Sequence, residues 1–142
     1  DLPPEECAEI NQFYREVDID SIFLMAPTTD ISRIRRISEM ASGFLYYVSF
    51  KGITGANSLD IDSVSSKLSE IRGVTELPLA VGFGIKDAET AAAVAAVADA
   101  VVVGSAIVSL IAANQEDMPT ALKEVKSLLQ GIKSALDNAG SI

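Results

Sequence analysis

The chain has 142 residues, 49% of them hydrophobic and 22% charged, a composition that indicates one folded domain rather than a disordered segment. Its formal net charge of −9 argues against nucleic-acid binding. With neither a membrane-length apolar run nor a recognisable signal segment, we expect a cytoplasmic protein. Histidine is absent and Cys7 is the single cysteine, which excludes histidine-dependent catalysis, an intrachain disulfide and a cysteine zinc cluster; we expect no metal site.

Helix and strand signals alternate through the first half of the chain. Apolar residues recur on one helical face from Cys7 to Val17, and a strand-like run follows at 19–27. A second helical period, from Ile31 to Met40, leads into another strand-like run at 43–50. Both runs are almost continuously apolar, as in parallel strands that are covered on both faces.

The second half repeats this order with a helix at 62–71, a strand at 77–84, an alanine-rich helix at 88–97 and a strand at 98–106. Asp87 is the expected N-cap of the alanine-rich helix. A short helix at 106–113 precedes a longer one with apolar residues in steps of three and four: Leu122, Val125, Leu129, Ile132 and Leu136. We expect this stripe to face the core, with a short coiled-coil seam as the alternative.

This alternation predicts an α/β fold of parallel strands joined by right-handed crossovers. Each strand–helix unit has roughly 30 residues, which is the repeat of a (β/α)8 TIM barrel. Residues 1–142 would then form a single domain equal to half of such a barrel, with about four strands. A doubly wound sheet has a similar repeat and remains the alternative.

Glycine turns follow the last two predicted strands. Gly82 and Gly84 end the third strand, and Gly104 and Ser105 end the fourth, where the short helix begins. Strand ends and helix N-termini bind anions in parallel α/β folds, because their backbone N–H groups are unpaired. The two turns therefore predict a site for a small-molecule phosphate ester, where Lys51 and Lys86 would offset part of the negative charge.

Two other features are open to more than one interpretation. Tyr46 lies within an apolar strand, which favours a core position over a catalytic one. The segment 51–60, with glycines on either side of Thr54, is typical either of a hinged lid over the strand ends or of a plain connector.

Taken together, the motifs DLPPEE, IFLMAPTTD, GFLYYVSFKGITGA, AVGFGI and VVVGSAIV resemble the second half of the tryptophan synthase alpha chain family. That resemblance implies a lyase that cleaves indole-3-glycerol phosphate to indole and glyceraldehyde 3-phosphate in tryptophan biosynthesis. It also implies the site residues. The phosphate would be held by Gly82, Phe83, Gly84, Gly104 and Ser105; Leu24 would line the indole pocket; Tyr46 and Thr54 would support the catalytic groups; and Asp1, Leu2, Pro3 and Pro4 would contact the beta chain of a heterotetramer.

The same resemblance implies no cofactor for this chain, since pyridoxal phosphate belongs to the beta partner. The family's two catalytic carboxylates lie in the other half of the barrel, so no residue here inherits their roles. We therefore expect an excised or truncated half that is inactive alone and that self-associates through its open strand edges, with two copies closing a pseudo-barrel as one possible form. The alternatives are a barrel isomerase of the histidine-pathway kind and a non-catalytic doubly wound binding module.

Overall fold

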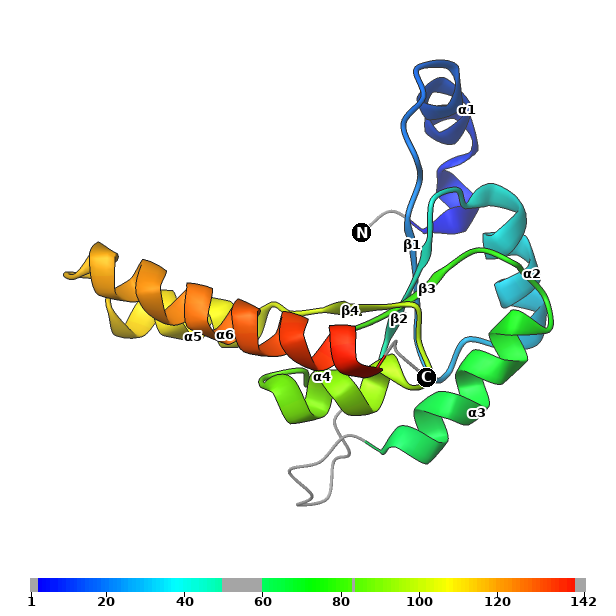
Figure 1. Ribbon diagram of the computed structural model, residues 1–142. Helices are drawn as coiled ribbons and strands as arrows, with labels where there is room; N and C mark the ends of the chain where they lie inside the picture. The colour runs from blue at the N-terminus through cyan, green and yellow to red at the C-terminus, as the bar shows by residue number, and fades with distance from the viewer. Residues whose placement is uncertain (1–2, 50–59, 83, 140–142) are drawn as a thin grey trace.

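The computed structural model describes residues 3–49, 60–82 and 84–139. Helices and strands alternate along the chain, as the sequence predicts (Figure 1). The elements are η1 (Pro4–Glu6), α1 (Ala8–Glu16), β1 (Phe23–Met25), α2 (Ile31–Met40), β2 (Leu45–Val48), α3 (Ile61–Arg72), β3 (Leu79–Gly82), α4 (Ala88–Ala95), β4 (Ala100–Val102), α5 (Ser105–Ala113) and α6 (Met118–Ala139).

The four strands form one sheet in the order β1-β2-β3-β4, and each neighbouring pair is parallel. Sequential order without a switch in mid-sheet is the arrangement of a (β/α)8 barrel and not of a doubly wound sheet. The half-barrel prediction is therefore confirmed. Strands are shorter than the apolar runs that predicted them, because each run continues beyond the paired residues into the turns at its ends.

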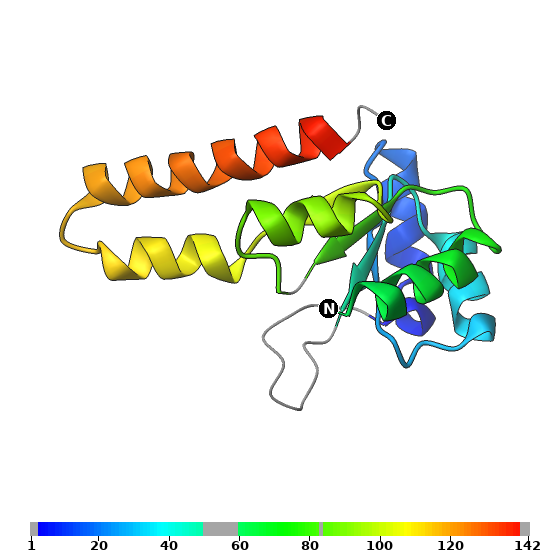
Figure 2. The ribbon, with the colours of Figure 1, turned by 60° about the horizontal axis from the view of Figure 1, so that its bottom comes forward.

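The outer face of the sheet forms the core with the helices that cover it (Figure 2). Side chains alternate along a strand, so every second residue points outward. Leu45 and Tyr47 of β2 and Leu79 and Val81 of β3 are at most 1% exposed. They belong to one cluster with buried residues of α2, α3, α4 and α6.

The inner face of the sheet is more open. Leu24, Tyr46, Ala80 and Ala100 are neighbours in the register of the four strands, so they form one row on this face. Leu24 is 44% exposed although it lies in the middle of its strand. A closed barrel fills this space with side chains from eight strands, and four strands supply only part of that layer.

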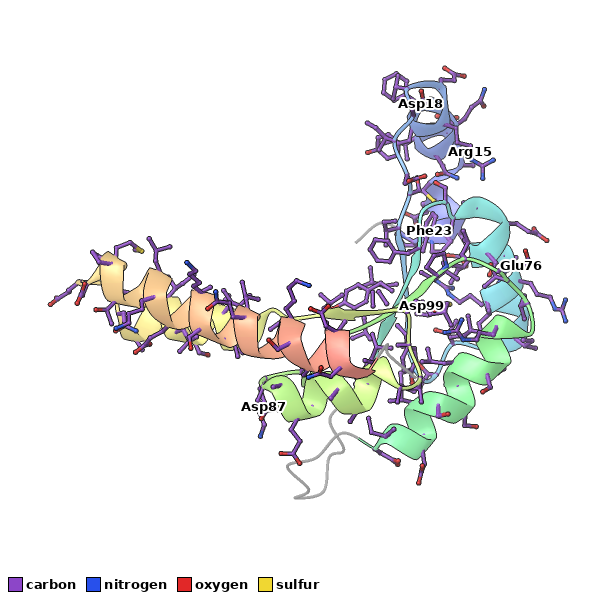
Figure 3. All side chains as sticks on the ribbon, in the orientation of Figure 1. Arg15, Asp18, Phe23, Glu76, Asp87 and Asp99 are labelled. Carbon is purple, nitrogen blue, oxygen red and sulfur yellow. The ribbon has the colours of Figure 1, made fainter. Side chains whose placement is uncertain are left out.

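Aspartates cap four of the described helices at their N-termini, and one of them is Asp117 before α6, which accepts from the Thr120 N–H at 3.2 Å. Asp30, Asp60 and Asp87 precede α2, α3 and α4, and each carboxylate accepts a hydrogen bond from the backbone N–H three residues later, at 2.8, 3.1 and 2.9 Å respectively. The Asp87 cap was predicted, and it is a full capping box with Thr90. Figure 3 shows Asp87 at the start of α4, with Asp99 at the other end of the sheet, where its carboxylate accepts from the Leu79 N–H at 2.8 Å.

Replacing Asp87 with alanine should lower the free energy of unfolding by about 1 kcal/mol, because a helix loses its capping acceptor. The hydrogen bonds from the backbone N–H and the hydroxyl of Thr90 hold the pKa of Asp87 below its usual range. The cap therefore contributes fully above the unfolded-state pKa, and its contribution falls as the pH drops through the lowered folded-state pKa. Urea unfolding across this acidic range measures the difference. Glu89→Ala, in the same first turn, is the control and should show no comparable loss.

The last two helices extend beyond the sheet as an antiparallel pair (Figure 2). The N-terminal half of α6 runs along α5, away from the sheet, and its C-terminal half packs on α4. The prediction that the apolar stripe of α6 faces the core is therefore confirmed for Ile132, which is 4% exposed, and for Leu136, which packs on the core. It is wrong for Leu122 and Leu129, which are 65% and 43% exposed. In the described part of the chain, none of the helices has the length and apolarity needed to cross a membrane.

Candidate functional site

The two glycine turns lie at the same rim of the sheet. Gly82 pairs with Val102 in the β3–β4 register, and both strands run in the same direction, so the turns that follow them are neighbours. Gly84 has a φ of +88°, a backbone conformation that residues with a side chain rarely adopt. This positive φ explains why glycine occupies position 84. Phe83, between the two glycines, lies outside the described residues.

The N-terminus of α5 is open at this rim. Gly104 precedes the helix and supplies no side-chain cap, and the Val108 N–H makes the first intrahelical bond, to the Gly104 carbonyl at 3.1 Å. The N–H groups of the first helical turn, beginning at Ser105, therefore have no partner within the helix. Among the residues that the structure describes, no atom lies within 4 Å of the position that a Cβ on Gly104 would take.

The N-terminus of the neighbouring helix, α4, is already capped by a carboxylate. The Asp87 carboxylate already accepts from the Thr90 N–H at 2.9 Å and from the Thr90 hydroxyl at 2.7 Å, at the positive end of the α4 dipole. A carboxylate in this place competes with any anion. Of the two helix starts, α5 is the one available for a phosphate. The side chain of Lys86 is exposed beside Asp87, and Lys51 lies outside the described residues.

Tyr46 and Gly82 are in close contact on the inner face below the rim. A Cβ on Gly82 would lie 2.7 Å from Cζ and 2.5 Å from Cε2 of the Tyr46 ring, and closer still to the hydroxyl oxygen. Tyr46 is half-buried, and Leu24 is its neighbour in the β1–β2 register. The predicted site residues Leu24, Tyr46 and Gly82 are thus brought together.

The adjacent tyrosine has a different environment. Tyr47 points into the outer core, is 1% exposed, and burial raises the pKa of its hydroxyl. The sequence analysis favoured a core position for Tyr46, but the tyrosine in the outer core is Tyr47, and Tyr46 is half-buried on the inner face of the sheet.

Ser49 is a residue of this site that the sequence analysis did not select. It is 2% exposed, and its N–H and hydroxyl both donate to the Gly82 carbonyl, at 3.1 and 2.9 Å. These bonds fix the backbone of β3 just before the glycine turn. The signal available in the sequence was a single polar residue at the end of the apolar run LYYV.

Only some of the remaining predicted site residues are among those that the structure describes. Asp1, Leu2 and Thr54 lie outside the described residues. Pro3 precedes η1 and Pro4 is its first residue, and Glu5 of this turn accepts a hydrogen bond from Arg33 of α2 at 2.7 Å. Within 3–49, 60–82 and 84–139, no group of three histidine, cysteine, aspartate or glutamate residues is placed to hold a metal ion.

Comparison with known proteins agrees with this geometry. The family model described as tryptophan synthase alpha chain matches residues 1–137. The chain belongs to the tryptophan synthase alpha chain family. A family member from Thioalkalivibrio sulfidiphilus is 53% identical over 137 residues, which are 96% of this chain and 52% of that protein. The chain therefore spans about half the length of the curated relatives it matches.

Solved structures of tryptophan synthase show the same fold. The alpha chain from Legionella pneumophila superposes with a TM-score of 0.84 at 37% identity, covering 100% of this chain and 52% of that one. A chain from the tryptophan synthase α2β2 complex of Pyrococcus furiosus gives a TM-score of 0.79 at 32% identity, covering 94% of this chain and 53% of that one.

Proposed function

We propose that this chain supplies the phosphate-binding part of a tryptophan synthase alpha chain, a lyase that cleaves indole-3-glycerol phosphate to indole and glyceraldehyde 3-phosphate. The observation that carries the proposal is the open N-terminus of α5 beside the Gly84 turn, in a member of this family. Backbone N–H groups and the helix dipole favour an anion there. We also propose that residues 1–142 form one domain, since the buried apolar residues form one cluster.

In this proposal the substrate extends from the rim onto the inner face. Its phosphate accepts hydrogen bonds from the backbone at Gly84, Gly104 and Ser105, with Gly82 and Phe83 completing the turn. Its indole ring lies toward Leu24, whose exposed side chain offers an apolar contact. Tyr46, half-buried next to Leu24, stands at the side of the reacting carbon atoms, where Thr54 would join it.

Cleavage requires a base for a hydroxyl proton and an acid for the indole ring carbon. At the described rim, the carboxylate of Asp87 is engaged by Thr90, so it is not placed for this work. We therefore assign both proton transfers to the part of the barrel that this chain does not match, and the binding of the phosphate to this chain. No cofactor is assigned to this chain.

Introducing a carboxylate at the start of α5 should abolish phosphate binding. In Ser105→Asp, the new carboxylate lies in the first turn of α5, where it interacts with the positive end of the helix dipole and repels the phosphate. We expect glycerol phosphate to shift the amide NMR signals of Gly82, Gly84 and 104–106 in the parent chain and to leave them unchanged in this variant.

Ser109→Asp is the matched control, because Ser109 is exposed on the same helix one turn further along. It adds the same charge without reaching the helix start, so we expect it to bind almost as the parent does. Shifts scattered away from the two turns, or equal loss in both variants, would refute the phosphate site.

We further propose that Asp1, Leu2, Pro3 and Pro4, the last of which begins η1, contact a beta chain that carries the pyridoxal phosphate. The support is that the related chain from Pyrococcus furiosus is part of a tryptophan synthase α2β2 complex and that an ion pair joins η1 to α2. The Arg33–Glu5 distance in this pair is 2.7 Å. A cytoplasmic location stays a prediction.

A polypeptide of residues 1–142 alone should associate with itself as its concentration rises. Among the described residues, β1 and β4 each have one unpaired edge, and Leu24 of β1 exposes apolar surface on the inner face of the sheet. Light scattering over a range of concentrations measures this association. A single monomeric mass at the highest concentration would contradict it.

A further inference from the structure

Ser49 places a buried hydroxyl at the end of an apolar strand. Burial alternates along β2 and the residue after it, so Leu45, Tyr47 and Ser49 are buried and the residues between them are half-buried. Position 49 therefore continues the row of β2 that packs in the core, where apolar side chains predominate. A buried hydroxyl is costly unless it forms a hydrogen bond. A serine at this position therefore calls for a physical reason.

The hydroxyl of Ser49 makes a bond that the pairing of the strands does not require. Val48 pairs with Gly82 in the β2–β3 register, and the Ser49 N–H donates to the Gly82 carbonyl at 3.1 Å, in continuation of the parallel ladder. Any residue except proline can supply that N–H. The hydroxyl donates to the same carbonyl at 2.9 Å, and this second bond depends on the side chain at position 49.

The backbone after this carbonyl is the glycine turn of the proposed phosphate site. Gly82 is the last residue of β3, and Gly84 has a φ of +88°. Glycine has more backbone conformations available than any other residue, so two glycines this close together give the turn little rigidity of its own. A site that adopts its binding arrangement only part of the time binds correspondingly more weakly. A contact from outside the turn must therefore hold it.

We propose that Ser49 is a positioning residue of the phosphate site, whose hydroxyl holds the Gly82 carbonyl and thereby keeps the glycine turn in the arrangement that binds the phosphate. Ser49 acts through the backbone of β3 and does not touch the ligand. The inference rests on the proposed function and adds to that site a side chain from the neighbouring strand. Because the turn contacts the phosphate group, Ser49 affects every phosphate ligand to the same degree.

Ser49→Ala removes the hydroxyl and leaves the backbone N–H in place. We expect the Kd of residues 1–142 for glycerol phosphate, measured from the amide NMR shifts of Gly84 and 104–106, to rise about three- to tenfold, which is the usual effect of one lost hydrogen bond. The Kd for inorganic phosphate should rise by the same factor. An unchanged Kd in the variant overturns this inference alone, whereas a parent chain that does not bind at the two turns overturns the proposed function as well.

Ser42→Ala is the matched control. Ser42 precedes β2, at the opposite end of the strand from Ser49, and its hydroxyl oxygen accepts from the Ser21 N–H at 3.0 Å. Each variant loses one serine hydroxyl that binds the backbone, so both should lower the urea midpoint to a similar extent. Only Ser49→Ala should weaken phosphate binding. Equal weakening in the two variants would indicate a general loss of stability and would overturn the proposal.

Ser49→Thr tests whether the donor itself is needed. Threonine keeps the hydroxyl and adds one methyl group to a buried position, so we expect phosphate affinity close to that of the parent together with a lower urea midpoint. Affinity would then follow the presence of the hydroxyl and not the stability of the chain. Binding as weak as that of Ser49→Ala would contradict a role for the hydroxyl.

Discussion

Replacing Gly82 with alanine is expected to lower the free energy of unfolding by about 1–3 kcal/mol, the usual effect of overpacking a well-packed site. The new Cβ would lie 2.5 Å from a ring carbon of Tyr46, well inside contact distance, and the ring would have to move. Ser49 limits relief from the other side, because it holds the Gly82 carbonyl through two hydrogen bonds. Chemical unfolding monitored by circular dichroism measures the loss.

The double variant Tyr46→Ala with Gly82→Ala tests the cause. Removing the ring makes room for the Cβ, so the loss should be less than the sum of the single effects, with a coupling of about 0.5–3 kcal/mol. Gly131→Ala is the control, because a Cβ there meets no atom within 4 Å and the residue lies within α6. It should stabilise the chain by about 0.5–1 kcal/mol. Strict additivity of the two single effects would mean that the ring is not the obstacle.

Much of the fold could be predicted because its signals are local. The alternation of apolar runs and helical periods gave the element order, and Asp87 followed by an alanine-rich helix gave the cap that the structure contains. The positions of Gly84 and Gly104 after two neighbouring strands were enough to place both turns at one rim. Strand order was open between two architectures, because periodicity carries no information on which strands pair.

Features that depend on distant packing could not be predicted in this way. Tyr46 and Tyr47 are adjacent in an apolar run, and only the sheet decides which one faces the helices and which the barrel interior. The apolar residues of α6 recur in steps of three and four along the whole helix, yet Leu122 is exposed and Ile132 is buried. The reason is that only the C-terminal half of the helix reaches the core.

A polypeptide of residues 1–142 alone is expected to release no detectable indole from indole-3-glycerol phosphate. Each positioned acid or base typically contributes about 10²–10⁴ in rate, and the rim described here has neither in place. Tight binding of the phosphate does not compensate, because holding the ground state leaves the chemical barrier unchanged. Indole release measured by chromatography, with the full-length Thioalkalivibrio sulfidiphilus relative as the positive control, tests this directly.

Adding the complementary part of that relative in trans should restore part of the activity, since the phosphate turns and the proton-transfer groups then share one barrel. Ser105→Asp in the restored assembly should raise the KM, because α5 begins at the rim that carries the two glycine turns. Association of the two parts without indole release would contradict the assigned reaction, and indole release by residues 1–142 alone would mean that catalytic groups lie within this chain.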